Sequence, residues 1–261
     1  MCNIVSIPLA MTLCAGLVCG CDKEDQNNTP RTNSTYAVVV GMENSQMAGK
    51  CEGAGYDADR MYNLISKFTQ NIVKFRDNAA TKSNVVKALS DSIEKSGTDG
   101  LVIFSYSGHG GSDPFPDTGI EEKDGKDEYL LLWDKYLRDN EIWNIINKSR
   151  SRVLLLFDCC HSQTLMRSPS FKVIPPLSWD HTMNDNVSFS MLCWSGCPDD
   201  KYSYGASTGG QFTNALLRHF NESKTYEQLW NDIKNDRTLR SYENPQSTTL
   251  GKGFDGKLAL R

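Results

Sequence analysis

The sequence of 261 residues has no excess of positive charge, because 28 Lys and Arg stand against 32 Asp and Glu. A nucleic-acid partner requires a basic face, so the composition argues against one. The 9 Pro and 20 Gly are too few for a collagen-like or low-complexity chain. With 39% hydrophobic and 10% aromatic residues, the chain is also too apolar to be disordered. These exclusions leave a globular protein whose length allows one large domain or two small ones.

No apolar run in the first 20 residues is long enough for a stable membrane anchor, and their uncharged stretch is typical of a signal peptide. It ends in Leu17-Val18-Cys19-Gly20-Cys21, which resembles the lipobox of bacterial lipoproteins and predicts lipidation of Cys21. A plain secretory signal that is cleaved nearby is the alternative. Residues 21–33 predict a polar tether, and its acidic start resembles a surface-export signal. We therefore expect a lipid anchor to the membrane of the bacterial cell envelope, at the outer membrane with surface display.

After cleavage of the predicted signal peptide and lipidation of Cys21, an odd number of cysteines remains. At least one thiol therefore stays unpaired within the chain. The spacing of Cys193 and Cys197 could suit a metal, but no second pair of ligands lies near it, so we expect no metal site. The remaining cysteines are Cys51, Cys159, Cys160, Cys193 and Cys197.

Apolar runs that alternate with amphipathic helical patterns predict an α/β fold with a mostly parallel central sheet. Helices on both faces of that sheet would give a three-layer sandwich, and residues 34–261 would form one domain. In such folds the chemistry lies at the carboxyl ends of the strands. The predicted strands are residues 35–41, 71–75, 101–106, 153–157 and 187–192, with a hairpin at 129–133; the predicted helices lie near 57–68, 85–93, 142–146, 212–220 and 226–233.

Reactive residues follow two of these strands. The strand at 101–106 runs into Ser107-Gly108-His109-Gly110-Gly111, and the strand at 153–157 runs into Asp158-Cys159-Cys160-His161-Ser162. A cysteine nucleophile requires a base that takes its proton and donors that hold the developing oxyanion. A His and a Cys at the ends of neighbouring strands can meet this requirement. The Gly-rich turn also leaves backbone N–H groups accessible.

Both segments resemble those of the caspase-like cysteine peptidases, and most closely the metacaspase branch in its bacterial form. Tyr106-Ser107-Gly108-His109-Gly110 matches the family's His segment. Its Cys segment is matched from Asp158 to Gln163, except that Cys159 replaces Ser and Gln163 replaces Gly. The resemblance spans residues 35–250 and implies a caspase-like fold.

The resemblance also implies a cysteine endopeptidase that uses a Cys–His dyad and requires no cofactor. His109 and Cys160 would be its catalytic residues, and the N–H groups of Gly110 and Cys160 would form the oxyanion site. Independently, strand alternation places Asp158 and Cys160 on one side and Cys159 on the other. A strained disulfide between Cys159 and Cys160, acting as a redox switch, remains open.

Two carboxylates would line the primary pocket, since the resemblance gives this role to Asp57 and Asp158, with Tyr56 in place of the family's Asn. Paired carboxylates favour a cation, so we expect peptide or protein substrates with Arg or Lys before the scissile bond. The alternative for Asp57 is an acid that caps a helix or lies in its first turn.

Acidic residues cluster at positions 121–128, followed by Asp134, and the resemblance implies activation by calcium here. A solvated acidic loop is the alternative. Family members are commonly monomeric, and we expect a monomer.

Two other functions compete with the peptidase hypothesis. One is a caspase-fold binding module on the cell surface, catalytically silent or a zymogen; the presence of both His109 and Cys160 disfavours a loss of catalysis. The other is a peptidase that cuts after Asp, whose pocket would require arginines where Asp57 and Asp158 stand.

Overall fold

The computed structural model describes residues 34–113, 127–159, 189–196, 205–239, 245–251 and 253–254. The predicted signal peptide, the lipidation site Cys21 and the tether lie outside these ranges, as do Cys160 and residues 121–126. Within the ranges, none of the helices combines the length and the apolar character needed to cross a membrane.

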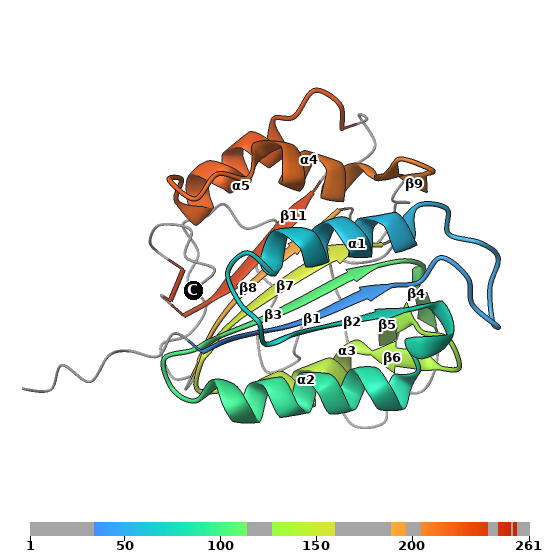
Figure 1. Cartoon of the computed structure of the whole chain (residues 1–261), viewed down its shortest axis with the longest axis horizontal. Coiled ribbons are helices and arrows are strands. Elements are labelled where there is room, and N and C mark those ends of the chain that lie inside the picture. The colour runs from blue at the N-terminus through green and yellow to red at the C-terminus, as the bar shows by residue number, and fades with distance from the viewer. Residues whose placement is uncertain are drawn as a thin grey trace, which may run out of the picture. The chain divides into compact units, whose positions relative to one another are not determined.

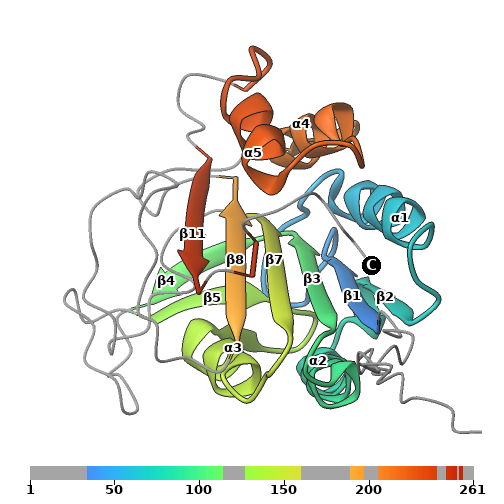
Figure 2. The ribbon, with the colours of Figure 1, turned by 90° about the vertical axis from the view of Figure 1, so that its left-hand side faces the viewer.

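A mixed sheet forms the centre of the described chain, with the strand order β11-β8-β7-β3-β1-β2, which Figure 2 shows from left to right. The pairs β1–β2, β1–β3, β3–β7 and β7–β8 are parallel, whereas β11 is antiparallel to β8. This confirms the predicted mostly parallel sheet. Its strands are β1 (Thr35–Gly41), β2 (Ile72–Arg76), β3 (Leu101–Ser107), β7 (Arg152–Asp158), β8 (Ser190–Ser195) and β11 (Gln246–Leu250).

Helices cover both faces of this sheet, so the three-layer fold is confirmed (Figure 1). On one face lie α1 (Ala54–Ile65), α4 (Gln211–His219) and α5 (Tyr226–Lys234). On the other face lie α2 (Lys82–Ser96) and α3 (Asp139–Ile146). The ends of these helices are fixed locally. The Thr225 hydroxyl, for example, accepts a hydrogen bond from the Gln228 amide at 3.1 Å, which caps α5.

Side-chain alternation along the strands divides the core into two clusters. Val38, Val102 and Phe104 pack towards α2 and α3, whereas Val39 and Ile103 pack towards α1, α4 and α5. Every residue of β3 is buried, as the sequence of a strand covered on both faces predicts. The same alternation decides which residues at the ends of β3 and β7 face α1 and α4.

Smaller ladders complete the fold around the carboxyl ends of the central strands. The predicted hairpin is confirmed as a sheet of β4 (Gly110–Asp113), β5 (Asp127–Leu131) and β6 (Tyr136–Arg138). The short pair β9 (Gly205–Ala206) and β10 (Gly209–Gly210) leads directly into α4.

Three details differ from the sequence-based expectations. Helix α1 begins at Ala54, three residues earlier than predicted, because Gly53 supplies the left-handed conformation before it. Strand β8 ends at Ser195, since Cys193 and Trp194 pair with both β7 and β11. Strand β11 was missed because its half-buried Ser and Thr residues lack the apolar pattern of the other strands.

We expect Phe104→Ala to lower the free energy of unfolding by about 3–5 kcal/mol, because it leaves a cavity in a close-packed core. The Phe104 ring is fully buried and lies edge-on to Phe157, with 5.7 Å between centroids. Urea unfolding followed by circular dichroism would measure the loss. The control is Lys87→Ala, an exposed side chain of α2, which should cost about 0.5 kcal/mol or less. Equal costs for the two variants would contradict the assignment of the core.

Candidate active site

The carboxyl ends of β3 and β7 lie side by side. Ser107 pairs with Asp158 in the parallel register, and the Gly108 amide donates to the Asp158 carbonyl at 3.2 Å. His109 follows Ser107 by two positions, as Cys160 follows Asp158. The predicted His and Cys segments therefore start from adjacent points of the sheet. Cys160 itself lies outside the described residues, so its role stays a prediction, and Gly110 is placed as the first residue of β4.

His109 is half-buried, and its Nε2 lies 3.0 Å from the carbonyl oxygen of Gly49. A carbonyl oxygen can only accept, so Nε2 carries the proton in this contact. In the neutral form of the ring, Nδ1 is then the nitrogen that can accept a proton, as a general base requires. The role of the Gly49 carbonyl could not be predicted from the sequence, because every residue has a backbone carbonyl group.

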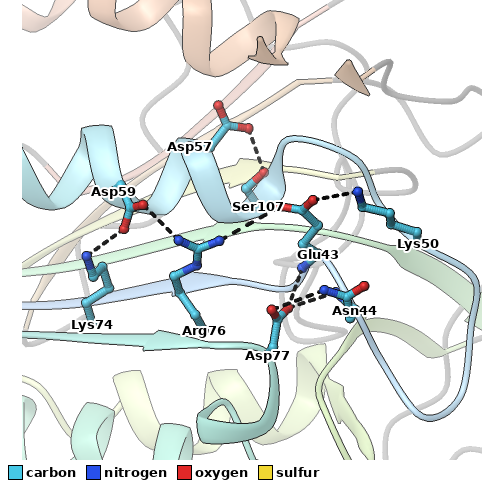
Figure 3. A network of polar contacts seen from close by, with 9 residues as sticks. All are labelled: Glu43, Asn44, Lys50, Asp57, Asp59, Lys74, Arg76, Asp77 and Ser107. Carbon is cyan, nitrogen blue, oxygen red and sulfur yellow. Dashed lines mark hydrogen bonds and ion pairs between the residues drawn. The ribbon is translucent and has the colours of Figure 1, made fainter. Parts of the chain in front are cut away.

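The loop that carries Gly49 is tied to the end of β2 by Asp77, as Figure 3 shows. The Asp77 carboxylate accepts the amide N–H groups of Glu43 at 3.0 Å and of Asn44 at 2.7 Å. The Glu43 carbonyl in turn accepts the Cys51 amide at 2.8 Å, which closes the base of the loop. The position of the Gly49 carbonyl thus depends on a carboxylate from another part of the chain.

Asp77 itself has a left-handed backbone conformation, with φ of 45°. Asp is among the few residues other than Gly that adopt this region readily. The preceding Arg76 is fixed at the same time, since its guanidinium bonds Asp59 of α1 at 2.8 Å. Asp59 also bonds Lys74 at 2.6 Å, so α1, β2 and the loop form one network of charges (Figure 3).

Asp57 and Asp158, which were predicted to share a pocket, do lie together in the structure. Asp57 is 1% exposed, and its Oδ2 accepts the Ser107 hydroxyl and the Gly210 amide, each at 2.8 Å (Figure 3 shows the former). The Oδ2 atom of Asp158 accepts the Thr213 amide at 2.8 Å. Although Asp57 lies in the first turn of α1, its carboxylate bonds β3 and β10 instead of capping the helix. The two carboxylates form a buried acidic site against the start of α4.

Gly210 is the residue that allows the two carboxylates to converge. A Cβ atom at this position would lie 2.2 Å from Oδ2 of Asp158, which is far inside contact distance. The neighbouring Gly209 has φ of 92°, a left-handed conformation that favours glycine. The Gly-Gly pair is therefore required for the approach of α4 to both carboxylates.

Burial raises the pKa of Asp57 to about 7, and the negative charge of Asp158 contributes to the increase. Hydrogen bonds from Gly210, Arg60 and Ser107 act in the opposite direction. At neutral pH the Asp57 carboxyl is therefore divided between its charged and neutral forms. A buried carboxyl that titrates near neutrality beside a second carboxylate is typical of a functional site.

Sequence reasoning missed several residues of this acidic site. Ser107 carried a usable signal, because it continues the face of β3 that leads to the site and stands in the His segment itself. Arg60 also carried one, since it lies three residues after Asp57 on α1 and therefore on the same side of the helix. The missed residues are Arg60, Ser107, Gly210, Thr213 and Asn214.

The described cysteines differ in their surroundings. Cys159 is 1% exposed and packs in the cluster under α2 and α3, which confirms that it faces away from Asp158. Burial raises the pKa of the Cys193 thiol well above its ordinary value, so this thiol is a poor nucleophile. Cys51 is half-buried in the loop that carries Gly49.

A metal site is not evident in the described part of the chain, where no three His, Cys, Asp or Glu side chains are arranged to hold an ion. Asp134, from the predicted acidic cluster, accepts the Lys82 amide at 2.8 Å and so serves the first turn of α2. Most of the cluster, residues 121–126, lies outside the described ranges.

Comparison with known proteins identifies one family and several curated relatives that are similar to this chain. The caspase domain family matches residues 34–249. Metacaspase-1A of Aspergillus niger is 22% identical over 82% of this chain and 70% of that protein, and metacaspase-1 of Pyricularia oryzae is 24% identical over 82% and 71%.

Solved structures are similar as well. A protein from Geobacter sulfurreducens has a TM-score of 0.66 at 26% identity, covering 84% of this chain and 94% of that one. Caspase-1 of Spodoptera frugiperda has a TM-score of 0.52 at 13% identity over 84% and 89%, a likeness of fold alone.

We expect the folded protein to lose stability as the pH rises from about 4 to about 7, because the Asp57 pKa of about 7 lies above the unfolded value of about 4. The folded state holds this proton more tightly than the unfolded state does, at about 1.4 kcal/mol per pKa unit. Asp57→Asn removes the titration and should flatten the decline between about pH 4 and pH 7, measured by urea unfolding. The control Asp91→Asn changes an exposed carboxylate whose pKa is lowered by Lys87, and should keep the wild-type slope. An unchanged slope in Asp57→Asn would contradict the buried titration.

We expect Asp77→Ala to release the loop that carries Gly49. The amides of Glu43 and Asn44 would lose their shared acceptor, and their hydrogen exchange should quicken about tenfold or more. The matched control is Asp59→Ala, which removes a carboxylate of the same network that bonds Lys74 and Arg76 instead of the loop. Equal exchange in both variants would show that Asp77 does not hold the loop.

Proposed function

The chain belongs to the caspase domain family, a family of cysteine peptidases, and we propose that it is itself a cysteine endopeptidase acting through His109 and Cys160. The observation that carries the proposal is the pairing of Ser107 with Asp158, from which the two reactive segments emerge side by side. The contact between His109 and the Gly49 carbonyl supports it further, because it engages Nε2 and leaves Nδ1 as the nitrogen that exchanges the proton.

The proposed reaction begins with transfer of the Cys160 proton to Nδ1 of His109. The thiolate attacks the carbonyl carbon of the scissile bond, and the N–H groups of Gly110 and Cys160 stabilise the oxyanion. His109 then protonates the leaving amine as the C–N bond breaks, which leaves a thioester on Cys160. Water, deprotonated by His109, hydrolyses the thioester and restores the thiol. The Gly49 carbonyl stabilises the imidazolium that forms in each half of the reaction.

The proposed substrates carry Arg or Lys before the scissile bond. Asp57 and Asp158 support this preference, since two buried carboxylates that share one site attract a cation. A substrate with Asp at that position would instead meet like charges, which disfavours the alternative specificity. The buried position of both carboxylates would make such a mismatch costly.

Four further properties belong to the same proposal. We propose activation by calcium through the acidic residues at 121–128, and a lipid anchor on Cys21 that holds the enzyme at the bacterial cell envelope, on the outer membrane and exposed at its surface. The enzyme would act as a monomer and require no other cofactor. A caspase-fold binding module remains the competing function.

We expect Cys160→Ala to reduce hydrolysis of fluorogenic peptides ending in Arg or Lys to the background rate, because it removes the nucleophile. The assay would run under reducing conditions, with calcium and with a chelator, and would include a peptide ending in Asp. Cys159→Ser is the matched control, since it alters the adjacent thiol, which packs in the cluster under α2 and α3, and should keep activity. Activity in Cys160→Ala would overturn the assignment of the nucleophile.

If the wild type cleaves none of the peptides and a thiol-reactive substrate analogue fails to label Cys160, the binding module would be the better explanation. Equal rates with calcium and with chelator would remove the calcium proposal alone.

A further inference from the structure

Arg60 places a positive charge inside the acidic site formed by Asp57 and Asp158. Its Nη2 lies 2.5 Å from Oδ1 of Asp57, and its Nη1 lies 2.6 Å from the side-chain oxygen of Asn214 on α4. The guanidinium also lies over the Tyr56 ring, 4.5 Å from its centroid. Three contacts from two helices therefore fix this cation, although its side chain is 23% exposed.

Both carboxylate oxygens of Asp57 accept hydrogen bonds from the surrounding protein. Oδ2 accepts Ser107 and Gly210, and Oδ1 accepts Arg60. Two carboxylates and one guanidinium leave the site with a single net negative charge when both acids are ionised. One net negative charge matches the one positive charge of an Arg or Lys side chain.

We propose that Arg60 is the internal counter-ion that sets how much negative charge the acidic site presents to the basic side chain of a substrate. Arg60 would thus be a specificity-determining residue, and this role rests on the proposed function. Without Arg60, the Oδ1 atom of Asp57 would lose its positively charged donor, and the charge of Asp158 would stand unopposed.

The groups that face Asp57 come from every element packed against it. Within the described ranges, the charged ones are Arg60 from α1 and Asp158 from β7. Strands β3 and β10 contribute neutral donors, the Ser107 hydroxyl and the Gly210 amide. Helix α4 acts indirectly, because Asn214 holds the far side of the Arg60 guanidinium. Removing Arg60 therefore removes the positive charge that opposes Asp158.

Loss of this charge should strengthen binding of a basic side chain, and least of all near neutral pH. The Asp57 pKa is already raised to about 7, so Arg60→Gln should raise it further and leave Asp57 neutral near pH 7. The proton on Asp57 then offsets part of the lost positive charge, so the acidic site gains least negative charge in this range. At alkaline pH Asp57 loses its proton while no internal cation remains, and binding should become clearly tighter than in the wild type.

The first experiment measures KM and kcat from pH 6 to 9.5 for an arginyl peptide and for the same peptide with citrulline. For the arginyl peptide, the KM of Arg60→Gln should lie below the wild-type value, with the smallest difference near pH 7, the largest at alkaline pH, and kcat little changed. Arg60→Lys keeps the charge and should keep the wild-type KM at every pH. For the citrulline peptide, which is neutral, the KM profiles of the wild type and Arg60→Gln should coincide. A KM for the arginyl peptide that is unchanged or raised at every pH would overturn the proposal, because it would indicate that Arg60 acts through packing alone.

The second experiment needs no activity and separates this inference from the proposed function. The Asp57 carboxyl carbon would be titrated by NMR in the full chain, in the wild type, Arg60→Gln, Arg60→Lys and the control Arg76→Gln. Arg76 is a half-exposed arginine that bonds Asp59, so its loss should leave the Asp57 titration in place. An upward shift in Arg60→Gln alone supports the counter-ion even if no basic peptide is cleaved, which would refute only the proposed function. An unshifted titration refutes the counter-ion, whatever the activity.

Discussion

The parallel register between β3 and β7 is the constraint on which the site depends. It sets Ser107 opposite Asp158 at the carboxyl edge of the sheet, and both segments that carry the proposed dyad start there. Because side chains alternate along a strand, a slip of one residue would turn Asp158 towards α2 and α3 and bring Cys159 to the opposite face. The apolar residues of both strands resist such a slip, since they are buried on both faces.

Around this edge, carboxylates accept hydrogen bonds from distant parts of the chain. Asp77 binds two amides of the loop that carries Gly49. Asp57 accepts an amide of β10, and Asp158 accepts an amide of α4. Each buried carboxylate is costly unless donors surround it, so each one dictates which backbone segment must approach. The loop, the turn at β10 and the start of α4 are thereby placed by the same sheet edge that positions His109.

The sequence predicted what depends on periodicity and on side-chain chemistry. The buried strands followed from their apolar runs, and the face to which Cys159 points followed from alternation. The meeting of Asp57 with Asp158 followed from the resemblance to the caspase-like peptidases. Strand β11 did not, because its polar residues pair only through the backbone ladder. The contact of His109 with the Gly49 carbonyl and that of Arg60 with Asn214 depend on how loops and helices pack in the folded chain. Such contacts join residues 60 and 154 positions apart, and no local pattern encodes them.

Stability and function oppose each other at the acidic site. Two carboxylates against Gly210 raise the pKa of Asp57 to about 7, so the fold gains nothing from ionising that group at neutral pH. Apolar residues in their place would make the fold more stable, but they could not attract a cation. Arg60 moderates this conflict by keeping part of the charge compensated when no substrate is bound. In the acidic site, the positive charge of Arg60 therefore compensates part of the negative charge of Asp57 and Asp158. Whether a cation lies beside Asp57 decides how readily that carboxyl takes up a proton.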